Sequence, residues 1–345
     1  MIKKQNRILW LDALKGYGII LVMLSHTLPY NEIMGILYSG FMALFFMASG
    51  YTDNKTFTRD VVIRKSKSLL IPYFIYGVVE CAFFDVVFAK QITYQGGTIH
   101  EWVGLIYARF CLYQYGTENN IYFLPIEATS PLWFLPALYT GFMVYYIFKK
   151  ICNGNIKKTY ALYVAMLLIT VFLNFLPNLL PWSLDVVFLV AFFIFLGNRM
   201  RYRYQTKMSI SQGALVLLSF CVYVLAAYYN GLVNFSIREF GKYEILSLFL
   251  FLVIGLTYFI VVSGLFCLLP KIITKIFSRM GILSLRLMCI QMPIFFVVGK
   301  VFKLYSIQNN FLEVSIKLLL VLIIAYIMEL VLNHMQRYLI VVKYL

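Results

Sequence analysis

The chain has 345 residues, of which 62% are hydrophobic and only 13% are charged. A soluble domain carries about twice that charged fraction, so the composition excludes a soluble globular protein. The formal net charge is +16, which in a soluble chain would suggest a nucleic-acid partner. Because the mean hydropathy is +0.83, we interpret the basic residues as determinants of membrane topology and expect no nucleic-acid partner.

Apolar runs recur along the chain, and each is long enough to cross roughly 30 Å of hydrocarbon. We expect ten of them, at residues 8–29, 33–51, 69–89, 131–148, 159–176, 183–198, 210–229, 245–268, 280–299 and 313–332. The predicted fold class is therefore all-α, a polytopic bundle of about ten transmembrane helices in a single integral-membrane domain, residues 1–345. We predict a multi-pass protein of a cell membrane in contact with lipid, with a bacterial inner membrane as the natural location.

The loops between these runs alternate in charge. Of the 30 Lys and Arg residues, 21 fall on one side of the predicted bundle and 7 on the other, with Lys15 and Arg286 inside predicted helices. Because cytoplasmic loops are enriched in Lys and Arg, both termini are predicted to be cytoplasmic. The longest connection on the opposite side, about residues 90–130, includes the stretch EWVGLIYARFCLY, which is apolar enough to lie in the interface or re-enter the membrane. The three His and six Cys residues are not spaced as metal ligands, so we expect no metal and no tightly bound cofactor.

The first predicted helix carries three ionisable residues, Asp12, Lys15 and His26. Such residues are costly inside a membrane and usually face the bundle interior or a wet cavity. Eleven residues separate Lys15 from His26, three full helical turns, so both project from nearly the same face, with Asp12 one turn below Lys15. Two ordinary interpretations stay open: Lys15 can form an interfacial ion pair with Asp12, and His26 can simply hydrogen-bond a neighbouring helix.

The chemistry of this stripe nevertheless indicates group transfer. A neutral imidazole is well suited to accept a proton near pH 7, and a lysine can meet a phosphate as a point charge. In the second basic loop, Arg64 and Lys67 lie three residues apart, one helical turn. These two residues fit either an anion site or ordinary topology-determining charge.

Five stretches together resemble the signatures of acyltransferase family 3, a family of membrane-bound O-acyltransferases. They are LDALKG followed by His26, with ten residues between Lys15 and His26, FFMASGY (45–51), RKSKSLLIPY (64–73), SPLWFLPALY (130–139) and GILSLRLMCIQMPI (281–294). The fourth is similar to the sugar O-acetyltransferase branch. The resemblance implies acetyl transfer from cytoplasmic acetyl-CoA, as the donor substrate, to a hydroxyl of a glycan or lipid-linked saccharide.

The resemblance also implies roles for single residues on the donor side. His26 matches the essential histidine of the family and would act as general base. Lys15 matches its basic partner, although arginine is commoner there and its bidentate phosphate contact would be lost. Arg64 and Lys67 match the basic pair that would hold the donor phosphates. Asp12 is the second candidate catalytic residue, orienting Lys15 or acting on the imidazole through a neighbour.

Two residues are candidates for binding the acceptor. Trp133 could stack on a sugar ring, and Gln291, which stands where a second histidine often appears, could hydrogen-bond the sugar. Trp133 also fits an interface anchor, and Ser49 and Gly50 fit close helix packing. The role of Arg286 is left open.

Two other functions are compatible with the sequence. A transporter or flippase for a lipid-linked glycan would share the many spans and buried polar residues, but no internal repeat is found. A non-catalytic partner in a glycan-assembly complex would leave the register of Lys15 and His26 as coincidence. The acceptor, the leaflet from which it enters, the route of the acetyl group and self-association as a homo-oligomer are left open.

Overall fold

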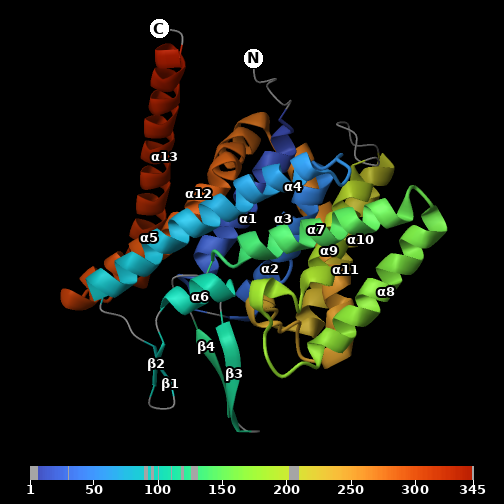
Figure 1. Ribbon diagram of the computed structural model, residues 1–345, viewed down its shortest axis with the longest axis horizontal. Coiled ribbons are helices and arrows are strands. Elements are labelled where there is room, and N and C mark those ends of the chain that lie inside the picture. Colours follow the sequence, from blue (N-terminus) through green and yellow to red (C-terminus); the bar gives the residue numbers. More distant parts are fainter. Residues whose placement is uncertain are drawn as a thin grey trace.

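The computed structural model describes residues 7–29, 31–88, 92–94, 97–99, 101–109, 111–117, 120–125, 131–201 and 210–343. Helices make up most of this structure (Figure 1). The principal helices are α1 (Leu9–Ser25), α2 (Glu32–Tyr38), α3 (Phe41–Tyr51), α4 (Arg59–Lys65), α5 (Ile71–Phe88), α6 (Glu101–Tyr107), α7 (Phe134–Cys152), α8 (Ile156–Asn174), α9 (Val187–Met200), α10 (Ile210–Asn230), α11 (Glu244–Leu268), α12 (Lys271–Leu304) and α13 (Asn310–Lys343).

Each of the ten predicted segments contains a helix, and among the described residues seven are long and apolar enough to cross a membrane. The three segments outside that set correspond to α1, α7 and α9, and α1 and α9 have only 17 and 14 residues. The prediction of a helical membrane protein is confirmed. The number of spans, about ten, and the cytoplasmic location of both termini stay predictions. Figure 1 shows the start of α1 and the end of α13 at the same end of the molecule.

The helical fold class is confirmed, and the connection between α5 and α7 adds short strands to it. Two antiparallel hairpins form there, β1 (Ile92–Tyr94) with β2 (Gly97–Ile99), and β3 (Cys111–Thr117) with β4 (Asn120–Pro125). They lie at the end of the molecule opposite to the start of α1 (Figure 1). In each hairpin the backbone N–H and C=O groups of one strand pair with those of the other. The apolar stretch predicted to lie in the interface divides between α6 and β3.

Two close helix crossings hold the centre of the bundle. A Cβ added at Gly16 in α1 would lie 1.9 Å from the Phe277 carbonyl oxygen of α12, and one added at Gly281 in α12 would lie 1.7 Å from the Asp12 carbonyl oxygen. Only glycine, which has no Cβ, permits this contact between the two backbones. Lys15, next to Gly16, is thereby held where α1 and α12 touch.

The second crossing joins α3 and α9 in the same reciprocal way. A Cβ at Gly50 would lie 1.9 Å from the Ile194 carbonyl oxygen, and one at Gly197 would lie 1.9 Å from the Met47 carbonyl oxygen. The packing role expected of Gly50 is thus confirmed. Ser49, its neighbour, faces a cavity instead.

The segment from α4 to α5 is a continuous helical rod with one irregular turn. Residues Ser66–Leu70 form a π-helix, η1, between α4 and α5. Such turns occur mostly inside α-helices and often at functional sites. The Ser66 hydroxyl bonds to the Val62 carbonyl (3.0 Å) and to the Tyr139 hydroxyl of α7 (3.2 Å), which ties the turn to the bundle.

Candidate functional site

A cavity of about 510 Å³ lies between α1, α3, α7 and α12. This size falls within the usual range, about 300–1,000 Å³, of small-molecule sites. The wall includes Lys15, Ile19, Val22 and Ser25 of α1 and the next residue, His26, which repeat at helical spacing. The prediction that Lys15 and His26 share one face of the first helix is therefore confirmed, and along α1 the cavity extends roughly 16 Å between them.

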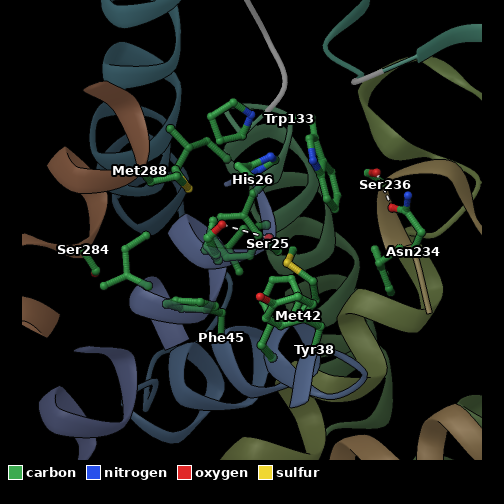
Figure 2. A pocket seen from close by; sticks show the side chains of 18 of the residues that line it. Ser25, His26, Tyr38, Met42, Phe45, Trp133, Asn234, Ser236, Ser284 and Met288 are labelled. Carbon is green, nitrogen blue, oxygen red and sulfur yellow. Dashed lines mark hydrogen bonds between the residues drawn. The ribbon is translucent and has the colours of Figure 1, made fainter. Parts of the chain in front are cut away.

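His26 directly follows the last residue of α1. The residue is exposed to a water-sized molecule because it lies on the cavity wall (Figure 2). Among the described residues no group forms a hydrogen bond with the ring. The ring nitrogens are thus available to a ligand, and the negative end of the α1 helix dipole favours positive charge beside the imidazole.

Asp12 does not reach the histidine. It is not among the residues that line the cavity, but it is close enough to Lys15 to attract the ammonium charge. The described cavity wall contains no Asp or Glu, so no carboxylate orients His26 directly. Of the two roles expected for Asp12, the placement supports the one beside Lys15.

The predicted basic pair lies outside the cavity. Arg64 and Lys67 are both exposed, and neither lines the cavity. The Arg64 Nε donates a hydrogen bond to the Asp60 carbonyl of its own helix (3.2 Å). The sequence correctly predicts that these two residues share a face, and that face is the outer one.

Trp133 lines the cavity near His26, on the wall where α7 begins (Figure 2). Its ring stacks on Phe235, with centroids 5.9 Å apart and an interplanar angle of 15°. Phe235 belongs to a connection, residues 232–236, that closes the cavity with Asn234 and Ser236. An indole held by a neighbouring ring is a rigid apolar surface for a ligand.

A buried charge cluster lies behind Trp133. The Arg109 Cζ is 5.7 Å from the Trp133 ring centroid, and its guanidinium donates to Asp185 Oδ2 (2.6 Å) and Ser183 Oγ (3.0 Å). The side chains of Arg109 and Asp185 are completely buried. The Arg238 Nη1 approaches the same carboxylate at 3.6 Å. The cluster therefore joins three connections, after α6, before α9 and after α10, into one rigid wall.

The family of the chain can now be stated from comparison. The acyltransferase family 3 model, described as an acyltransferase domain, matches residues 8–330, nearly the whole chain. The chain belongs to this family. Neither a curated protein nor a solved structure matches it. The protein is thus an acyltransferase of a membrane family, and its cavity is the candidate active site.

All five family-like stretches reach this one cavity. Besides Lys15 and His26, they contribute Phe45 and Ser49 from the second, Leu69 from the third, Pro131, Trp133, Phe134, Leu135 and Leu138 from the fourth, and Ser284, Leu285 and Met288 from the fifth. They are separated by up to about 270 residues of sequence, so their convergence depends on the tertiary fold.

Two predicted or open residues lie away from the cavity. Gln291 is completely buried, its Nε2 donates to the Met288 carbonyl (3.2 Å), and it does not line the cavity. Its proposed contact with an acceptor stays a prediction. Arg286 pairs with Glu329 of α13 at 3.9 Å, which gives this membrane arginine a structural partner.

Sequence reasoning missed several residues of the site. Tyr38 lines the cavity, and its buried hydroxyl has no hydrogen-bond partner in the described part of the chain. Nothing in the sequence distinguishes Tyr38 from 26 other tyrosines. Asp185, in contrast, could have been found from the sequence. An acidic residue inside a predicted membrane segment indicates a buried cationic partner.

Proposed function

We propose that this acyltransferase is an O-acetyltransferase that moves the acetyl group of acetyl-CoA to a hydroxyl of a glycan or lipid-linked saccharide. The observation that carries the proposal is one cavity with Lys15 at one end and His26 at the other. A phosphate-bearing thioester needs a cation for its phosphates and a base near its carbonyl, separated by the length of a flexible arm.

In this proposal the donor enters from the Lys15 end, which the distribution of basic loops predicts to be cytoplasmic. Lys15 holds a donor phosphate, while Arg64 and Lys67 on the outer surface attract the anionic donor. The thioester reaches along the cavity to His26. No cofactor is needed, because the reaction exchanges only an acyl group and a proton.

His26 acts as general base on the acceptor hydroxyl. The imidazole takes the hydroxyl proton as the oxygen attacks the thioester carbonyl, and the C–S bond then breaks. The proton passes to the coenzyme thiolate, so the products are an acetyl ester and free coenzyme A. The carbonyls at the end of α1 stabilise the imidazolium formed during the step. Trp133 stacks on the acceptor sugar, which makes the aromatic wall the acceptor side.

The test compares three proteins in detergent: the parent, His26→Ala and Lys15→Ala. Acetyl transfer from acetyl-CoA to candidate glycans is measured by thiol release and by mass spectrometry of the product. We expect His26→Ala to lose about 10² to 10⁴ in kcat, and Lys15→Ala to raise the KM for acetyl-CoA with kcat largely spared. Full activity in a folded His26→Ala protein would remove the catalytic claim, and glycan movement without acetylation would favour a transporter.

A further inference from the structure

A lysine between the two exposed basic residues faces the opposite way. Lys65 is half-buried, whereas Arg64 and Lys67 are exposed. Leu69, one turn after Lys65, is buried and lines the cavity. Residues four apart on a helix project from the same face, so Lys65 lies on the inward face of this helix, next to the cavity but not among the residues that line it.

The surroundings of Lys65 contain an excess of cations. Lys65 is close enough to both Lys15 and Lys55 for their charges to repel, and Asp53 is the carboxylate that attracts it. The Asp53 carboxylate is already engaged by the Tyr146 hydroxyl (2.5 Å) and by the Lys55 backbone N–H (3.3 Å). Two carboxylates, Asp53 and the Asp12 beside Lys15, face three lysines here, which leaves this end of the cavity with an excess of positive charge.

The Lys65 ammonium is held without an ion pair of its own. Its Nζ lies 3.2 Å from the centroid of the Phe142 ring, an attraction worth about 0.5–2 kcal/mol. No described carboxylate lies within ion-pair distance of it. An incoming anion with several oxygens can therefore gain both lysines without first breaking a salt bridge.

We propose that Lys65 and Lys15 together bind the phosphate oxygens of the acyl-CoA donor at this end of the cavity, while Arg64 and Lys67 stay outside it. The inference rests on the proposed function and adds a residue to it. Lysines bind phosphate as point charges on flexible stems, so Lys65 can leave the Phe142 ring and reach the ligand. The same chemistry would suit the phosphate of an anionic lipid, and the experiment below separates the two sources.

The first experiment measures equilibrium binding of radiolabelled acetyl-CoA to the protein in phosphatidylcholine nanodiscs. Lys65→Met keeps the alkyl stem over Phe142 and removes the charge, and Lys65→Arg keeps the charge. Lys157→Met is the matched control, because Lys157 is an exposed residue at the start of α8. We expect Lys65→Met to raise the Kd about tenfold or more, with Lys65→Arg and Lys157→Met close to the parent. An unchanged Kd in folded Lys65→Met overturns the inference.

A second measurement needs no variant and covers the case in which Lys65→Met fails to fold. The parent is treated with an amine-reactive reagent with and without coenzyme A, and the modified lysines are identified by mass spectrometry. Coenzyme A is expected to protect Lys65 and Lys15 but not Lys157. Equal modification of Lys65 in both samples contradicts the inference.

The outcomes also separate this inference from the proposed function. If the parent itself binds no acetyl-CoA, the proposed function fails and the inference fails with it. If the parent binds and the Lys65 results are negative, only the inference fails. In nanodiscs that contain phosphatidylglycerol, loss of bound lipid in Lys65→Met without loss of acetyl-CoA affinity would assign Lys65 to a lipid phosphate and overturn the donor assignment.

Discussion

The two ends of the cavity hold charge in different ways. At the Lys15 end, the charged groups are long side chains close to carboxylates, with Asp12 near Lys15 and Asp53 near Lys65. At the His26 end, the charges of Arg109 and Asp185 are completely buried and lie behind the aromatic wall. The lysines at the first end suit a ligand that is recognised by its charge. The rigid aromatic wall at the second end suits a ligand that is recognised by its shape.

The largest expected effect on stability comes from the rigid end. Asp185→Asn should lower the free energy of unfolding in detergent by about 3–5 kcal/mol, because it leaves the Arg109 charge buried without its partner. Asp60→Asn, at an exposed position in the first turn of α4, should change it by less than about 1 kcal/mol. Similar stability losses in both variants would show that the buried pair does not hold this wall.

A smaller loss of stability is expected where α1 crosses α12, close to the Lys15 end of the cavity. Gly281→Ala places a methyl group against the Asp12 carbonyl and should destabilise the protein by about 1–3 kcal/mol. Gly213→Ala, with nothing within 4 Å of the added Cβ, should be neutral or slightly stabilising. Thermal unfolding of the two alanine variants checks the contrast, and a Gly281→Ala protein as stable as Gly213→Ala would contradict the close crossing.

A substitution in the aromatic wall should change the KM for the acceptor and not the KM for the donor. Trp133→Ala is expected to raise the acceptor KM about tenfold, since an aromatic contact is worth roughly 0.5–1.5 kcal/mol beyond its buried area. The KM for acetyl-CoA should stay unchanged, and Trp133→Phe should recover most of the loss. Steady-state kinetics with each substrate varied in turn make the measurement. A rise in the donor KM alone would reverse the assignment of the two ends.

The smallest effect concerns the unpaired hydroxyl on the cavity wall. Tyr38→Phe should raise the free energy of unfolding by about 1 kcal/mol, because a buried hydroxyl without a partner is destabilising. Tyr258→Phe should lower it by a similar amount, since the Tyr258 hydroxyl bonds to the Leu37 carbonyl (3.0 Å) and to Tyr17 (3.1 Å). Denaturant unfolding of both variants checks the opposite signs, and destabilisation by Tyr38→Phe would show that its hydroxyl has a partner.

The features that the sequence by itself could predict are those that depend on the repeat of a single helix. Apolar length predicted the helices, and a spacing of eleven residues placed Lys15 and His26 on one face, because both depend only on the geometry of a single helix. The same geometry placed Arg64 and Lys67 together. It could not say which face of that helix turns inward, because that depends on the helices packed against it.

Only the tertiary structure decided the remaining features. Arg109 and Asp185 are 76 residues apart, and their pairing depends on how three connections meet. The connection at 232–236 closes the cavity without any sequence signature that we recognised. Both are contacts between distant segments, and such contacts follow from packing of the whole bundle, whereas a helical face follows from the chain's own repeat.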